Sequence, residues 1–154
     1  MSNLPASRDA QAGVTLMELL VVISIIGILA GIAIPSYQKS VSKTRRRAAE
    51  ACLSNYAGFM ERFYTSNLRY DVDVAGTAVA LPAVDCASAA NTGNYYDYRF
   101  SGAVAQAAYM LQAIPKTGSG QDTKDAQCGT LTLDQTGARG ASGAGNAAAI
   151  AACW

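Results

Sequence analysis

Hydrophobic residues are concentrated in one uninterrupted stretch near the start of the chain, from Val14 to Pro35. No charged side chain occurs between Leu19 and Gln38, so twenty consecutive residues are uncharged. As an α-helix they would extend about 30 Å, which is the thickness of the hydrocarbon core of a bilayer. The pattern predicts a helix that is apolar on all sides and that spans a membrane or is buried among other helices.

The pattern becomes amphipathic after this uncharged stretch. From Ala48 to about Asn67, apolar residues recur at helical spacing on one face, and polar residues fill the other. We therefore expect one helix from Val14 to about Asn67, with residues 39–67 packed against a folded domain. The expected apolar face consists of Ala49, Cys52, Leu53, Tyr56, Phe59, Met60, Phe63 and Tyr64, and the polar side of Glu50, Ser54, Asn55, Gly58, Glu61 and Arg62.

Strands are expected further along the chain, at Tyr95–Ser101, Ala108–Ile114 and Gly129–Asp134. The last of these alternates strictly, with Leu131 and Leu133 on one side. Residues 68–93 have little periodicity and are expected to form a loop. Residues 137–152 are mostly Gly and Ala, a composition typical of disorder, although Cys153 would restrain them. The predicted fold class is α+β, a long helix packed on a small antiparallel sheet of three or four strands.

One carboxylate lies within the apolar stretch. A charged Glu18 in hydrocarbon would cost on the order of 2.5–3.5 kcal/mol, so it requires a partner. Cleavage of the chain after Gly13 would place the α-amino group of Val14 one helical turn away, where it can neutralise Glu18 within one molecule or between neighbours. We interpret residues 1–13 as a removed leader, because the apolar stretch of a Sec signal precedes its cleavage site, whereas here the apolar stretch follows it.

The segment Gly13-Val-Thr-Leu-Met-Glu18-Leu, followed by the apolar stretch and Pro35, resembles the prepilin motif of type IV pilins and type II secretion pseudopilins. Glu18 matches the family's Glu at the fifth mature position, and Pro35 matches a kink common in the family. Val14 stands where Phe is usual. The segment from Cys128 to Gly140, together with Cys153 and Trp154, is similar to the C-terminal part of PilE-type minor pilins of gammaproteobacteria.

This resemblance implies the type IV pilin fold with a C-terminal disulfide loop. It implies that a prepilin peptidase cleaves after Gly13 and methylates the Val14 amine. The chain would then span the inner membrane once, with a periplasmic C-terminal domain. The inner-membrane assembly machinery would add it to other pilin subunits, with Glu18 and Pro35 acting in assembly. The implied functions are pilus assembly, twitching motility, adhesion or DNA uptake.

The expected organisation follows from these patterns. It comprises a leader at 1–13, an apolar membrane or filament-core helix at 14–38, its amphipathic continuation at 39–67, and a globular region at 68–154 that holds the loop, the sheet and the C-terminal disulfide.

The chain has four cysteines, which can pair in three ways. Beside an apolar segment of the export type, they indicate two disulfides and an oxidising compartment. We expect Cys128 to pair with Cys153, as in the C-terminal disulfide that the resemblance implies. We also favour Cys52–Cys86, a pair that the resemblance does not cover and that would join the helix to the following loop. Closing a loop of about 25 residues contributes roughly 3–3.5 kcal/mol.

A basic cluster, consisting of Lys39, Lys43, Arg45, Arg46 and Arg47, follows the uncharged stretch. It is either a solvated helix face, partly paired through Arg46 and Glu50, or a surface that contacts lipid headgroups or acidic groups of neighbouring subunits. The positive-inside rule would place this cluster in the cytoplasm. The cysteines and the prepilin resemblance favour the opposite side of the membrane.

Composition argues against several other functions. The chain has no histidine, no visible nucleophile–base pair and no CxxC, so we expect no catalysis, no cofactor and no metal. Asp71 and Asp73 are weak evidence for a calcium site. Residues 68–154 contain five Lys/Arg and seven Asp/Glu, which argues against direct binding of nucleic acid. The resemblance implies a minor pilin, and the alternatives are a major pilin, a type II secretion pseudopilin and an anchored periplasmic domain that does not polymerise.

Overall fold

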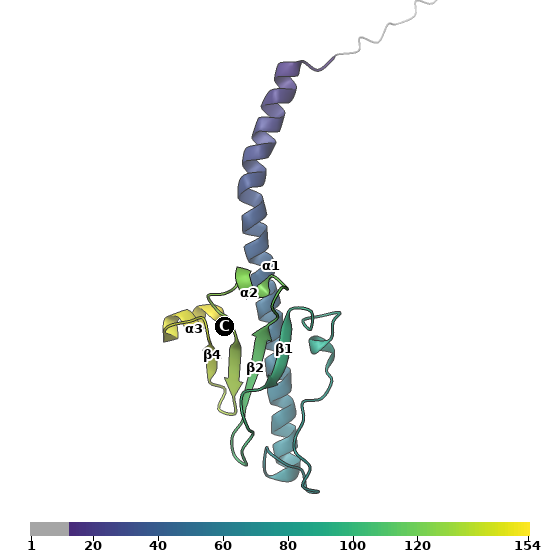
Figure 1. The fold of residues 1–154 in the computed structure, drawn as a ribbon, viewed down its shortest axis with the longest axis vertical. Coiled ribbons are helices and arrows are strands. Elements are labelled where there is room, and N and C mark those ends of the chain that lie inside the picture. Colours follow the sequence, from purple (N-terminus) through teal and green to yellow (C-terminus); the bar gives the residue numbers. More distant parts are fainter. Residues whose placement is uncertain (1–12) are drawn as a thin grey trace, which may run out of the picture. The chain divides into compact units, whose positions relative to one another are not determined.

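The computed structural model describes residues 13–154, which form two compact units that divide between Tyr37 and Gln38. Helix α1 (Leu16–Asn67) begins in the first unit and continues into the second (Figure 1). It starts two residues later than expected and ends where expected. Pro35 lies inside α1, where its ring nitrogen cannot donate a backbone hydrogen bond.

The second unit contains a four-stranded antiparallel sheet whose spatial order equals its chain order. The strands are β1 (Tyr96–Phe100), β2 (Met110–Pro115), β3 (Leu131–Asp134) and β4 (Arg139–Ala141). Three short helices lie outside the sheet: η1 (Asp85–Ala87), α2 (Gln121–Lys124) and α3 (Ala147–Cys153). Each strand pairs antiparallel with the next one in the chain, so the sheet is a simple meander.

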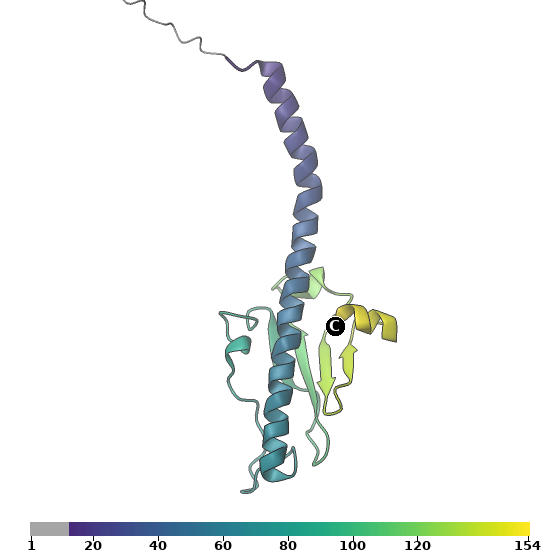
Figure 2. The same cartoon turned by 180° about the vertical axis from the view of Figure 1, so that it is seen from behind.

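The part of α1 that belongs to the second unit lies along one face of this sheet, as Figures 1 and 2 show from opposite sides. The sheet face that meets the helix is built from cross-strand pairs such as Leu111 with Leu133 and Ala113 with Leu131. Alternate residues of a strand point to the same face, so these side chains are buried together. The buried hydrophobic core consists of Ala49, Cys52, Leu53, Tyr56, Met60, Tyr70, Tyr96, Tyr109, Leu111, Ala113, Cys128, Leu131, Leu133, Ala141 and Cys153.

The predicted fold class is confirmed, since a long helix packs on an antiparallel sheet and a disulfide joins Cys128 to Cys153. The three predicted strands correspond to β1, β2 and β3. On α1, Leu53 and Met60 are buried as predicted. Glu50 is not on the solvated side as predicted, because its residue is only 8% exposed.

The composition of residues 137–152 was misleading, because β4 and most of α3 lie in this segment. β4 is held by pairing with β3, a partner that local composition does not reveal. α3 begins after Asn146, whose side chain accepts a hydrogen bond from the backbone N–H of Ala149 at 2.9 Å. Asn before an Ala-rich run is a helix start signal that the sequence contains.

We predict that Leu111→Ala lowers the free energy of unfolding by about 2–5 kcal/mol, because Leu111 is fully buried and its truncation leaves a cavity. Its neighbour Met110 is 42% exposed and supplies the matched control. Denaturant unfolding of the full-length protein in detergent measures both variants. Equal losses for Leu111→Ala and Met110→Ala would show that this strand face does not form the core.

Candidate functional site

The N-terminal segment places the predicted processing residues just before α1. Gly13 and Val14 precede the helix and are exposed. Thr15 caps the helix, because its hydroxyl oxygen accepts a hydrogen bond from the N–H of Glu18 at 3.2 Å. Thr15 and Glu18 have the spacing of a capping box, a helix start signal that the sequence analysis overlooked. Glu18 therefore lies in the first turn, where the partial positive charge of the helix N-terminus favours a carboxylate.

The first unit exposes nearly all of its apolar side chains. Leu16 is 82% exposed, Ile32 is 70% exposed, and the least exposed of the large ones, Val22, is still 45% exposed. An 18-residue window of α1 has a mean hydropathy of 2.6 and none of it is buried. Within residues 13–154, no hydrogen bond or ion pair involves the side chain of Glu18. A surface of this kind requires lipid or other protein around it.

The basic cluster does not act as one solvated surface. Arg46 lies beside Glu50 as the first interpretation expected, but it is buried rather than solvated. Contact with lipid headgroups or neighbouring subunits stays a prediction. Arg46 is only 4% exposed and forms an ion pair with Asp125, 79 residues away. The guanidinium of Arg45 lies over the ring of Tyr95, 3.8 Å from its centre. Lys39 and Lys43 remain exposed. Arginines 45–47 therefore hold the second unit together, and the lysines face outward.

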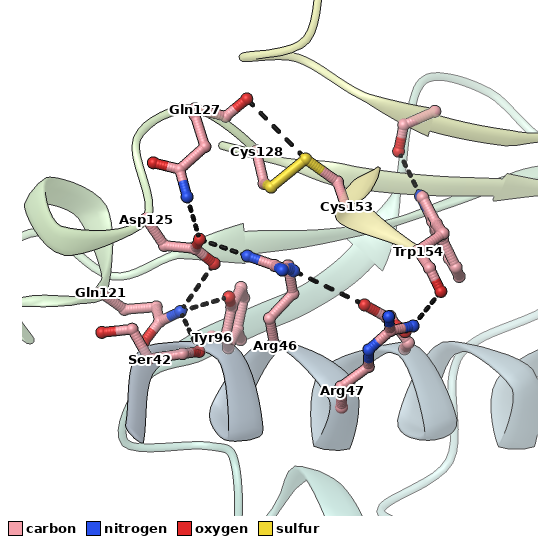
Figure 3. Close-up of polar contacts among 12 residues, drawn as sticks. Ser42, Arg46, Arg47, Tyr96, Gln121, Asp125, Gln127, Cys128, Cys153 and Trp154 are labelled. Atoms are coloured by element: carbon pink, nitrogen blue, oxygen red, sulfur yellow. Dashed lines mark hydrogen bonds and ion pairs between the residues drawn. A yellow bond between two sulfur atoms is a disulfide. The ribbon is translucent and has the colours of Figure 1, made fainter. Parts of the chain in front are cut away.

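A buried polar network joins α1 to the segment between β2 and β3 (Figure 3). The carboxylate of Asp125 accepts hydrogen bonds from Arg46, from Gln121 Nε2 at 3.0 Å and from Gln127 Nε2 at 3.1 Å. Gln121 Nε2 also donates to the backbone oxygen of Ser42 at 3.0 Å and to the Tyr96 hydroxyl at 2.9 Å. Burial raises the pKa of Tyr96. The network fixes the short helix α2 against the middle of α1.

Glu50 lies beside this network and is the buried acid of α1. Its Oε2 is 3.0 Å from Arg47 Nη1, and its Oε1 is 3.7 Å from Arg46 Nε. Burial raises the pKa of Glu50, although the guanidinium groups of Arg47 and Arg46 oppose this shift. Among the described residues, Arg46 Nε and Glu50 Oε1 are buried polar atoms without a hydrogen-bond partner. The two arginines therefore stabilise the carboxylate only in part.

The C-terminal residues also return to α1. Arg47 donates a hydrogen bond to the carbonyl oxygen of Trp154, and the Trp154 indole N–H donates to the Gly140 carbonyl at 2.9 Å (Figure 3). The guanidinium of Arg139 lies 5.1 Å from the centre of the Trp154 ring. These contacts link the last residue to both the helix and β4. The sequence analysis noted Trp154 only as part of a resemblance.

Two disulfides hold the outer segments of the second unit. The structure joins Cys52 to Cys86, the pairing that the sequence analysis expected, and this ties α1 to η1. It also joins Cys128 to Cys153, which are 25 positions apart in the sequence. Gly143, within this loop, passes so close to the segment before Cys128 that a Cβ there would clash with the backbone of Ala126 and Gln127. Only glycine fits at that position.

Asp71 and Asp73 are occupied by local contacts rather than arranged around a cation. Asp71 forms a two-pronged ion pair with Arg69, at 2.6 and 2.7 Å, which lowers the pKa of Asp71 to about 2. Asp73 accepts hydrogen bonds from the N–H groups of Ala75 and Thr77 at 2.9 and 2.8 Å. Within residues 13–154, no group of three or more potential metal ligands is found.

Comparison with known families gives two matches. The model described as "Prokaryotic N-terminal methylation motif" matches residues 8–34. The model described as "Type IV minor pilin ComP, DNA uptake sequence receptor" matches residues 35–132, which is more than half of the chain. The prediction of a type IV pilin is therefore confirmed, with ComP as the named minor pilin where the sequence analysis had pointed to PilE-type proteins.

Individual relatives are also fimbrial proteins and pilins. Fimbrial protein EcpC of Eikenella corrodens is 36% identical over 73 residues, which are 47% of this chain and 48% of that protein. The type IV major pilin PilA of Myxococcus xanthus is 35% identical over 91 residues, 59% of this chain and 37% of that protein. The chain thus spans less than half the length of these relatives. A solved type IV pilin from Shewanella oneidensis is 26% identical, with a TM-score of 0.44, over 73% of this chain and 97% of that one.

We predict that Asp125→Asn lowers the free energy of unfolding by about 3–5 kcal/mol, because it removes the hydrogen-bonded counter-charge of the buried Arg46 and leaves only Glu50, 3.7 Å from Arg46 Nε. Asp97→Asn is the matched control. Its side chain is 62% exposed in an ion pair with Lys116, so its loss should cost less than about 1 kcal/mol. Denaturant unfolding compares the two variants. If Asp125→Asn were as mild as Asp97→Asn, the network would not anchor α2.

Proposed function

Because the chain belongs to the family of type IV minor pilins described as ComP, we propose that it is a minor subunit that enters a pilus through the apolar part of α1. Family membership supports the role of a pilus subunit. The apolar helix and the N-terminal methylation motif are consistent with a membrane-anchored pilin. The observation that carries the proposal is the exposed apolar surface of the first unit, which needs neighbours of its own kind once it leaves lipid.

Maturation is the first step that we propose. A prepilin peptidase cleaves between Gly13 and Val14 and methylates the new amine of Val14. The exposure of both residues ahead of α1 supports access for such an enzyme. Residues 1–12 of the expected leader lie outside the described residues.

Assembly depends on Glu18 in this proposal. The carboxylate lies at the start of α1 and has no side-chain partner within residues 13–154. The Val14 amine of an adjacent subunit supplies the counter-charge when the apolar helices pack together. An ion pair in such a dry environment forms only when both charges meet closely, so it sets the axial register of neighbouring subunits. Pro35 leaves one backbone carbonyl of α1 without its usual donor and allows local adjustment there.

The cellular setting follows from the same argument. We propose a single pass through the inner membrane, a periplasmic second unit, and transfer by the inner-membrane assembly machinery into an extracellular filament that supports twitching motility and adhesion. The two disulfides support an oxidising compartment for residues 38–154. The C-terminal disulfide favours a pilin over a pseudopilin. A major pilin remains the alternative, because several relatives are major pilins.

DNA reception is a second candidate, favoured by the printed description of the family model that matches residues 35–132. It runs against the sequence-based expectation of no direct DNA binding, which rested on the net charge of −2 over residues 68–154. A receptor would bind through phosphate contacts, and its affinity would fall steeply with salt.

We expect DNA binding, if it is the function, to weaken at least about tenfold between 50 and 200 mM salt. Fluorescence anisotropy of labelled duplex DNA with the full-length protein in neutral detergent measures this. A salt-dependent association would establish the receptor function. No association at 50 mM salt would rule out the receptor function, and the filament role would then stand alone.

We predict that Glu18→Ala reduces the amount of this subunit in sheared pili by at least about tenfold, because the methylated amine of its neighbour would then be buried without a counter-charge. The membrane level of the subunit and its two disulfides should be unchanged. Ser24→Ala is the control, since Ser24 lies in the same apolar stretch and its hydroxyl donates a hydrogen bond to the Leu20 carbonyl within its own helix. Normal incorporation of Glu18→Ala would refute the role of this carboxylate.

A further inference from the structure

A basic pocket lies in the second unit, formed by two segments that are distant in the sequence. It is a hollow of about 310 Å³. Lys39, Lys43 and Arg46 of α1 line one side, and Lys124, Asp125 and Gln127 line the other. Four cations therefore surround one carboxylate.

The single acid of this pocket is already fully engaged. Asp125 is buried and pairs with Arg46, and it also accepts hydrogen bonds from Gln121 and Gln127 (Figure 3). Its charge is thus balanced by Arg46 at the floor of the pocket. Within residues 13–154, none of the three lysines takes part in an ion pair. The pocket consequently carries three uncompensated positive charges at its rim.

The pocket lies immediately after the uncharged part of α1. Lys39 is the first charged residue after the run from Leu19 to Gln38, and Lys43 follows one helical turn later, roughly 6 Å along the axis. When the uncharged run lies in hydrocarbon, these lysines reach the depth of the lipid phosphates. Lysine binds a phosphate as a point charge, without the fixed geometry that Arg requires.

We propose that this pocket binds the phosphate group of an anionic phospholipid headgroup while the subunit is still in the membrane. The inference rests on the proposed membrane anchoring, and it adds a ligand and a site that the filament role does not require. A phosphate oxyanion seated among Lys39, Lys43 and Lys124 compensates charges that the protein itself leaves unmatched. It also makes the extraction of the subunit from the bilayer sensitive to the headgroup bound there.

A lipid fits this pocket better than a nucleic acid does. The site is a compact hollow beside an apolar helix, whereas duplex DNA needs an extended row of cations along its backbone. The rest of the second unit does not extend the positive surface, since residues 68–154 carry more acidic than basic groups. Free phosphate shares the chemistry of the headgroup, and the test below separates the two sources.

Native mass spectrometry of the full-length protein in neutral detergent tests the proposal. The probes are phosphatidylglycerol and phosphatidylcholine with identical acyl chains. We expect at least about tenfold preferential binding of phosphatidylglycerol, since each lysine near an anionic headgroup contributes a factor of about five. Lys43→Gln with Lys124→Gln should abolish this preference. Arg62→Gln with Arg99→Gln removes two exposed charges elsewhere and should leave it unchanged.

A charge-relocating variant separates the pocket from a general attraction to anionic lipid. Lys43→Gln with Thr44→Lys keeps the net charge and nearly the same depth, but it moves the charge to a side chain that lines a different hollow. We expect this variant to lose the preference for phosphatidylglycerol to the same extent as Lys43→Gln alone. Wild-type behaviour of the relocated variant would overturn the proposal.

Three further results would also overturn it. These are equal binding of the two lipids, displacement of phosphatidylglycerol by millimolar inorganic phosphate, and binding of duplex DNA instead of lipid through the same lysines. Each result is independent of the filament role, because a subunit that enters pili normally can still lack the lipid preference. Conversely, a subunit excluded from pili can still be tested for lipid binding in detergent.

Discussion

A single helix, α1, has to bury apolar surface in two different ways, and most of the structure follows from that requirement. Its first part is apolar on all sides and finds no cover among residues 13–154, so its burial must come from lipid or from other subunits. Its second part is apolar on one face only, and the chain supplies the cover in the form of a four-stranded sheet. The first part of the helix thus needs an apolar environment on all sides, whereas the second part packs one face on the sheet and exposes the other to water.

The second unit contains a buried ion pair between α1 and the β2–β3 connection. Arg46 and Asp125 are both buried, and Gln121 and Gln127 complete the hydrogen bonding of the carboxylate. Buried ion pairs often add little net stability compared with apolar side chains. Their geometry is demanding, however, so this pair determines where the β2–β3 connection meets the helix. The same connection carries Lys124 to the rim of the basic pocket, and the fold and the proposed lipid site therefore share one anchor.

Two disulfides tie further segments of the second unit to one another. Cys52–Cys86 attaches the connection before β1 to the helix, and Cys128–Cys153 attaches the end of α3 to the segment before β3. Arg47 and Trp154 then bring the last residue back to α1. Segments with weak hydrophobic patterns are thus held by bonds and polar contacts rather than by a large core of their own.

Local patterns in the sequence determined the long helix, three of the four strands and the apolar surface that leads to a filament role, because hydrophobic periodicity is a property of neighbouring residues. Strand β4 and the roles of Arg46, Asp125 and Gln121 were decided only by the tertiary structure, since Gly-rich strands and buried polar residues depend on partners distant in the chain. Arg46 and Asp125 are 79 residues apart, and no spacing rule connects them. The same holds for the basic pocket, because Lys124 joins Lys39 and Lys43 only when α2 is fixed against the helix.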